Sequence, residues 1–100
     1  MFCYQCEQTS QGNCCTTFGV CGKTPELAAL QDLLLHGLMG LSQVAVVARK
    51  RGIIDDEINI FTCEALFSTL TNVNFDPNSF VKLIDKTIEL RDSLIKKVEK

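Results

Sequence analysis

Four cysteines near the start of the chain have the residue type and the spacing of a metal site. Cys3, Cys6, Cys15 and Cys21 form the pattern C-x2-C-x8-C-x5-C. Thiolates are soft ligands, and in proteins they bind zinc ions and iron–sulfur clusters. A single flexible loop that carries four of them is able to fold around one metal centre. The pattern therefore predicts metal chemistry in residues 1–24.

The uneven spacing of these cysteines favours an iron–sulfur cluster over the two alternatives. A structural zinc ion usually takes two close pairs of ligands, and only Cys3 and Cys6 form such a pair here. Disulfides are typical of short secreted chains, but the first residues lack the basic start and apolar segment of a signal peptide. A zinc site and a set of disulfides or unliganded thiols remain as alternative interpretations.

The residues between the cysteines are of types that suit a negatively charged cluster. Glycines permit tight turns that direct backbone N–H groups toward sulfur, and these hydrogen bonds tune a reduction potential. We expect this role for three residues: Gly12, Gly19 and Gly22. We expect four apolar side chains to shield the cluster from water: Phe2, Tyr4, Phe18 and Val20.

Length and composition indicate one globular domain with no affinity for nucleic acid. The chain has 100 residues, of which 46% are hydrophobic, and its formal net charge is −2. The only basic run, Arg49-Lys50-Arg51, is expected at the C-terminal end of a helix, where cations are favoured. An acidic redox module favours positively charged partner surfaces.

Beyond the cysteines the pattern predicts three helices and no strand, which gives an all-α three-helix bundle behind an N-terminal cysteine-rich loop. The predicted elements are the loop 1–24 and helices over 25–52, 55–72 and 76–99. Thr24-Pro25 and Asp76-Pro77 each combine a capping residue with proline at the first helical position. An acidic first turn marks the start of the second helix.

The first predicted helix is apolar nearly all round, beyond the stripe that one packing face requires. Asp32 and Arg49 bracket its apolar run, and His36, Ser42 and Gln43 interrupt it, so we do not expect it to span a membrane. Two interpretations remain for the excess apolar surface. Either the helix packs on both sides within the domain, or one face meets another domain or a second copy of the chain.

Two further residues carry reactive groups, and we expect neither to act in chemistry. Cys63 shares a helical face with Ile60, Phe67 and Leu70, which predicts a buried cysteine that behaves as a small hydrophobe. His36, the only histidine, is expected to be a packing or surface residue. A catalytic dyad of this histidine with a cysteine is the less favoured alternative.

Segments beyond the cysteines resemble a known family. They are MFCYQCEQT at 1–9, GVCGKTPE at 19–26, LQDLL at 30–34 and ALFSTLTNVNF at 65–75. Together they closely resemble the N-terminal part of the hybrid cluster protein family, also called the prismane or hydroxylamine reductase family. The resemblance runs through most of the chain.

The resemblance implies a [4Fe–4S] cluster on Cys3, Cys6, Cys15 and Cys21, carried on a helical bundle. In the family this cluster passes electrons to a separate hybrid cluster in further domains, where hydroxylamine or nitric oxide is reduced. Other members of the family use wider cysteine spacing and a smaller cluster. This chain ends at Lys100 without a counterpart of those domains, so we expect an electron relay without reductase activity of its own.

Several expectations accompany this relay. Cys14 departs from the family pattern, which implies Cys15 as the ligand, with Cys14 as the less favoured substitute. The expected partner is a redox protein or the missing reductase domains, and self-association through the first helix is an alternative. Air-sensitive clusters on thiolates imply a reducing, cytoplasmic setting, as in an anaerobe or microaerophile. The chain is either a short stand-alone redox protein or one domain of a longer reductase.

Overall fold

A computed structural model of the chain describes residues 1–6, 8–70 and 73–99. The described residues form three α-helices, α1 (Pro25–Lys50), α2 (Asp56–Ser68) and α3 (Pro77–Glu99), and a short 3-10 helix, η1 (Ser10–Gly12). No strand is present in these segments, and the only β-type feature is a single bridge within the loop. The predicted all-α fold with three helices is confirmed.

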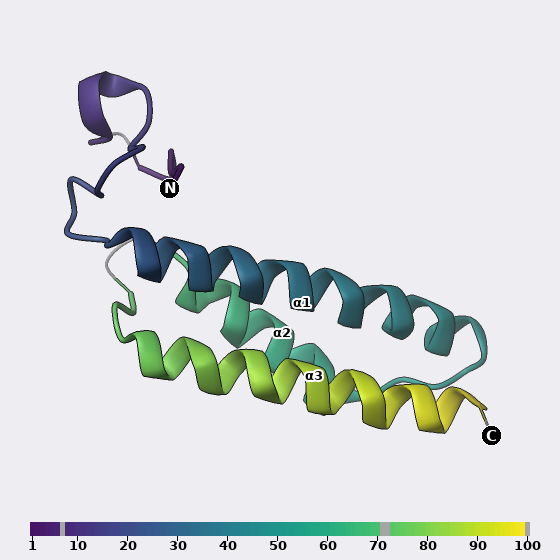
Figure 1. The fold of residues 1–100 in the computed structure, drawn as a ribbon. Coiled ribbons are helices and arrows are strands. Elements are labelled where there is room, and N and C mark those ends of the chain that lie inside the picture. Colours follow the sequence, from purple (N-terminus) through teal and green to yellow (C-terminus); the bar gives the residue numbers. More distant parts are fainter. Residues whose placement is uncertain (7, 71–72, 100) are drawn as a thin grey trace.

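The helices lie along one another, and the cysteine-rich loop projects from one end of them (Figure 1). The dimensions of the described chain are 51 × 24 × 17 Å. α1 and α3 run in the same direction, and α2, which lies between them in the sequence, runs in the opposite direction. The loop and the C-terminal end of α2 therefore lie at the same end of the molecule. There the Gln5 Nε2 donates a hydrogen bond of 3.0 Å to the Thr69 carbonyl oxygen. This bond ties the loop to the helical part.

The start of α1 follows the predicted capping pattern. The Thr24 hydroxyl accepts a hydrogen bond of 3.1 Å from the Leu27 N–H, and Pro25 occupies the first turn. This bond satisfies one of the N–H groups that a helix start leaves without a partner. The helix ends at Lys50, two residues before the predicted end at 52, because Gly52 turns the chain with φ of +80°.

The second helix is shorter than predicted, because it ends at Ser68 instead of 72. The Ser68 and Thr69 hydroxyls donate to the carbonyl oxygens of Ala65 and Leu66, at 2.6 and 2.8 Å. Hydroxyl groups that bond to nearby carbonyls in this way compete with continued helix. The last two residues of the predicted helix, 71 and 72, lie outside the described residues. α3 begins at Pro77, as the proline pattern predicts.

The core lies along the contact between α1 and α3, with α2 covering one side. Its buried members come from all three helices: Leu27, Leu34, Leu38, Leu41, Ala48, Ile58, Phe61, Ala65, Phe80 and Leu94. The α1 members recur at helical spacing along one face. Gly37 lets α1 approach α3 closely, since an added Cβ there would lie 3.3 Å from the Thr87 Cγ2.

The prediction for the packing face of α2 is wrong. Cys63 is exposed, and so are its face neighbours Ile60 and Phe67, with 60% and 61% of their surfaces accessible. The buried face instead carries Ile58 and Phe61. Both sides of this helix bear large apolar side chains, so helical periodicity alone could not decide which side faces α1 and α3.

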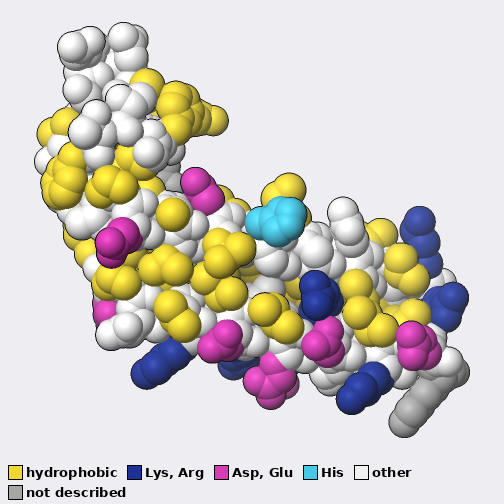
Figure 2. All heavy atoms as spheres, viewed as in Figure 1, with side chains coloured by type: hydrophobic (Ala, Val, Ile, Leu, Met, Phe, Trp, Pro, Cys, Tyr) yellow, Lys and Arg dark blue, Asp and Glu magenta, His cyan; other side chains and the backbone are white. Residues whose placement is uncertain are grey.

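The excess apolar surface of α1 is not covered by the described part of the chain. Four of its large apolar side chains are more than two-fifths exposed: Leu33, Met39, Val46 and Val47. Figure 2 shows hydrophobic side chains spread over the visible face of the helical part. The interpretation in which this helix packs on both sides within the domain is therefore wrong. By length and composition alone α1 also qualifies as a candidate membrane span, although its leucines at the contact with α3 are buried.

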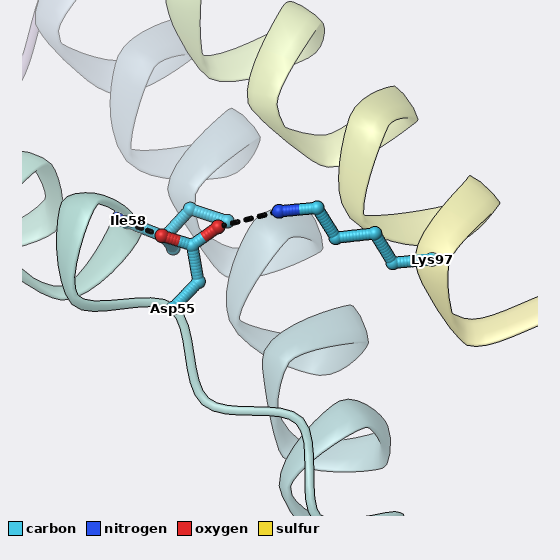
Figure 3. A network of polar contacts seen from close by, with 3 residues as sticks. All are labelled: Asp55, Ile58 and Lys97. Atoms are coloured by element: carbon cyan, nitrogen blue, oxygen red, sulfur yellow. Dashed lines mark hydrogen bonds and ion pairs between the residues drawn. The ribbon is translucent and has the colours of Figure 1, made fainter.

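Asp55 joins the start of α2 to the end of α3 (Figure 3). Its Oδ1 accepts from the Ile58 N–H at 3.3 Å, and its Oδ2 lies 3.1 Å from the Lys97 Nζ. The hydrogen bond from Lys97 lowers the pKa of this carboxyl group, and the Ile58 N–H acts in the same direction. The folded state therefore favours the carboxylate form.

We predict that the charge of Asp55 stabilises the fold fully above the ordinary pKa of an aspartate, and that this stabilisation is lost as pH falls through the lower pKa of the folded state. Asn still caps a helix, so Asp55→Asn should lower the free energy of unfolding at pH 7 by less than about 1 kcal/mol, through loss of the ion pair. Asp55→Ala also removes the cap and should cost about 1 kcal/mol more. Because the pKa is lower in the folded state, the gap between wild type and Asn should close as pH falls through that value.

Urea unfolding between pH 7 and about pH 3 measures these differences, since the unperturbed carboxyl titrates near 3.8. A gap between wild type and Asp55→Asn that widens toward low pH would contradict the assigned direction.

Candidate metal centre

Cys3 and Cys15 face each other across a short antiparallel backbone pairing. The Cys3 N–H donates to the Cys15 carbonyl oxygen at 2.9 Å, and the Cys15 N–H donates to the Cys3 carbonyl oxygen at 2.7 Å. These two bonds form the isolated bridge of the loop. Two of the predicted ligands are thus held opposite each other by backbone, although they are distant in sequence.

All four predicted ligands line one small pocket in the loop. Cys3, Cys6, Cys15 and Cys21 contribute to its wall, and Cys14 does not. Cys15 is buried, and the other three are half-buried. The remaining lining residues come mostly from the loop around them: Met1, Gln5, Thr9, Gly19, Val20 and Lys23.

The sulfurs of Cys3 and Cys15 each accept a hydrogen bond. The backbone N–H of Ser10, at the start of η1, donates to the Cys15 Sγ at 3.4 Å. The Lys23 Nζ donates to the Cys3 Sγ at 3.6 Å. Donors of this kind stabilise thiolates and tune the potential of a cluster that thiolates hold.

The burial of Lys23 is unusual, because lysine is almost never fully buried without a paired charge. Only 2% of its surface is accessible. Besides the Cys3 sulfur, its Nζ contacts the Gln5 Oε1 at 3.3 Å. Sequence reasoning missed this residue, since its type predicts a solvent-exposed side chain.

Gly19 makes room for Lys23. A Cβ at Gly19 would lie 2.8 Å from the Lys23 Cβ, closer than real Cβ contacts come. The Gly19 N–H also donates to the Lys23 carbonyl oxygen at 2.8 Å, and Gly22 turns the chain between them with φ of +101°. The glycines therefore close the loop around the lysine.

The N–H groups of Gly12, Gly19 and Gly22 donate to carbonyl oxygens and close backbone turns. The Ser10 N–H, in the turn that ends at Gly12, donates to the Cys15 sulfur, in agreement with the expected role of a glycine turn. The expectation for the apolar side chains is wrong. The four side chains expected to shield the pocket are all more than half exposed: Phe2, Tyr4, Phe18 and Val20. Phe2 and Tyr4 instead contact each other edge to face, with ring centroids 5.2 Å apart.

Four thiols that line one pocket provide the donor set of a metal centre. Among the residues that the structure describes, no three cysteine, histidine, aspartate or glutamate side chains converge closely enough to bind one metal ion. A cluster offers several iron atoms, so its thiolates need not meet at one point. The thiol donors, the two hydrogen bonds to sulfur and the buried ammonium are all compatible with an iron–sulfur cluster.

Neither of the other reactive side chains belongs to this pocket. His36 is exposed on α1, in agreement with the expected surface position, and Cys63 is exposed on α2. No disulfide joins Cys3, Cys6, Cys14, Cys15 or Cys63. The chemistry of the described residues is therefore concentrated in the loop.

Comparison with known proteins gives a consistent result over the whole chain. A family profile described as Prismane/CO dehydrogenase family matches residues 1–100. A hydroxylamine reductase of Syntrophobacter fumaroxidans is 62% identical over 99 residues, which are 99% of this chain and 18% of that protein. A hydroxylamine reductase of Methanocella arvoryzae is 58% identical over 94 residues, which are 94% of this chain and 17% of that protein.

The chain thus spans less than a fifth of the length of these relatives. The match over all 100 residues confirms the family that the sequence segments predict. The chain belongs to the Prismane/CO dehydrogenase family.

Proposed function

We propose that this chain is an electron-transfer module that holds one [4Fe–4S] cluster on Cys3, Cys6, Cys15 and Cys21. The observation that carries the proposal is the shared pocket of these four thiols, from which Cys14 is absent. The hydrogen bonds to the sulfurs of Cys3 and Cys15 support it, because they stabilise ionised thiols.

The loop residues would bind the cluster and set its properties. The four thiolates supply the iron ligands, and the backbone pairing of Cys3 with Cys15 holds two of them in place. The Ser10 N–H and the Lys23 ammonium donate to sulfur. When bound, a cluster of this type accepts and gives up one electron at a time. Iron–sulfur redox chemistry needs no acid, base or nucleophile from the helices, and the exposed positions of His36 and Cys63 suit such a relay.

A second candidate function is a part in hydroxylamine or nitric-oxide reduction within a larger assembly. The similarity to proteins named hydroxylamine reductase, 62% and 58% identical, favours it. In that assembly the chain would supply electrons, and other domains or chains would bind the substrate. We propose the remainder of such a reductase or a separate redox protein as its partner, self-association through α1 as the alternative, and the cytoplasm as its location.

The decisive experiment is metal and sulfide analysis of the chain purified without oxygen. We expect about four iron atoms and four inorganic sulfides per chain, with a brown colour that bleaches on reduction. Protein that contains zinc without iron and stays colourless would replace the proposal with a structural zinc module. Protein that takes up neither metal, even after anaerobic reconstitution, would overturn both.

A separate assay distinguishes the relay from an enzyme. The loaded chain, supplied with an artificial electron donor, should take up electrons without consuming hydroxylamine. Steady hydroxylamine consumption by this chain alone would contradict the relay function.

A further inference from the structure

We propose that Lys23 is a positioning residue that sets the reduction potential of the cluster through its buried ammonium group. The inference rests on the proposed function, because it concerns the site that the four thiols form. Three observations support it: the burial of Lys23, the two contacts of its Nζ, and the space that Gly19 leaves for its side chain.

The burial of this ammonium is the first step of the argument. A buried charge is strongly unfavourable unless an opposite charge pairs with it. The ion pairs between described residues are Arg91 with Asp92 and Lys97 with Asp55, so no carboxylate in that part of the chain pairs with Lys23. The groups in contact with its Nζ are the Cys3 sulfur and the neutral amide of Gln5. Among the described residues of the loop, negative charge at the thiolate site is therefore the counter-charge next to this ammonium.

The charge of the cluster site matches this requirement. Four thiolates around a [4Fe–4S]²⁺ core leave a net charge of about −2, and reduction makes it about −3. A fixed positive charge next to one ligand stabilises the reduced form more than the oxidised form, because the attraction grows with the negative charge. The Lys23 ammonium should therefore raise the reduction potential.

Two neighbours hold the ammonium at this place. The Gln5 side chain accepts from the Lys23 Nζ through Oε1 and donates to the Thr69 carbonyl oxygen through Nε2. The amide thus connects the lysine to the end of α2. Gly19 removes the Cβ that would collide with the lysine stem, so the loop is built to enclose this side chain.

Three substitutions of Lys23 separate its charge from its hydrogen bond and from its volume. Lys23→Met keeps the length of the side chain and removes both charge and donor. Lys23→Gln keeps an N–H donor without charge, and Lys23→Arg keeps the charge. Lys96→Met is the matched control, because Lys96 is exposed in the last turn of α3, at the opposite end of the molecule from the loop.

The measurement is an anaerobic equilibrium redox titration of the loaded protein, followed by absorbance, with iron and sulfide content determined on each sample. We expect the potential to fall in Lys23→Gln, to fall further in Lys23→Met, and to stay near wild type in Lys23→Arg and Lys96→Met. This order is specific to charge near the cluster, since a purely structural role would change cluster content and leave the potential of the loaded fraction unmoved.

The outcomes that overturn the inference are distinct from failure of the proposed function. A loaded Lys23→Met or Lys23→Gln protein with the wild-type potential would remove the role in tuning. Loss of the cluster from all three variants, the charge-retaining Lys23→Arg included, would assign Lys23 to assembly instead. If the wild-type chain itself binds neither iron nor sulfide, the proposed function fails before Lys23 is considered.

Discussion

Replacing Cys15 with serine should remove most of the cluster that we propose for the loop, whereas replacing Cys14 should leave it in place. The two residues are adjacent, yet Cys15 lines the pocket with the other three ligands and Cys14 does not. The Cys15 sulfur also accepts the Ser10 N–H at 3.4 Å. Loss of a ligand should exceed the roughly 10–100-fold weakening that follows loss of an outer-shell partner.

The measurement is iron and inorganic sulfide per chain after parallel anaerobic reconstitution of both variants. Cys63→Ser is the control, because this cysteine is exposed on α2, outside the pocket. We expect wild-type content in Cys14→Ser and in Cys63→Ser. A cluster that survives in Cys15→Ser and disappears in Cys14→Ser would reverse the ligand assignment.

Truncation of Phe80 should destabilise the helical part by about 3–5 kcal/mol. Its side chain has no accessible surface, and it lies in the core that α1, α2 and α3 share. Alanine at this position loses the apolar contacts of the phenyl ring and leaves a cavity that the packed helices cannot fully close. Since domains are stable by only about 5–15 kcal/mol, we expect partial or complete unfolding at room temperature.

Phe67→Ala is the matched control, because the same side chain on α2 is 61% exposed. Its effect should stay within about 0.5 kcal/mol. Helicity by circular dichroism and the urea midpoint report both variants, and Phe80→Leu provides a milder change in case alanine leaves no folded population. Equal losses from Phe67→Ala and Phe80→Ala would contradict the packing of α2 and α3 described above.

The parts of the fold that depend on local chemistry were predictable from the sequence. Thr24 with Pro25, Asp55 with its acidic first turn, and Asp76 with Pro77 each mark a helix start, and each helix begins there. Such signals act within one turn of the chain, so no knowledge of packing is needed to interpret them. On α1, which is apolar nearly all round, the buried leucines Leu34, Leu38 and Leu41 follow one another at helical spacing.

The parts that depend on distant packing were not predictable. On α2, Ile58 and Phe61 compete with Ile60 and Phe67 as apolar faces, and only contact with the other helices selects the first pair. Lys23 was missed because no local pattern indicates its burial. Its burial depends on space beside Gly19 and on two distant acceptors, Gln5 and Cys3, which no local pattern contains.

At the candidate site, the spacing of the cysteines identified a common loop, and the structure brings those four thiols to one pocket. A backbone N–H donor to sulfur from a glycine-containing turn was expected, and the Ser10 N–H provides one, whereas the Lys23 donor was not foreseen. Exposure of Phe2 and Tyr4 was also unexpected. A short loop lacks the area to bury every apolar side chain that it carries.

The pairing of Cys3 with Cys15 has a consequence for oxygen damage. Residues that exchange both backbone bonds across antiparallel chains have Cα atoms about 5.5 Å apart, which is within the range that a disulfide spans. Once iron has left, an oxidant that takes two electrons from these thiols, with release of two protons, would join them covalently. The disulfide would then hold the two sulfurs together, and a thiol reductant would have to cleave it before the loop could bind iron again.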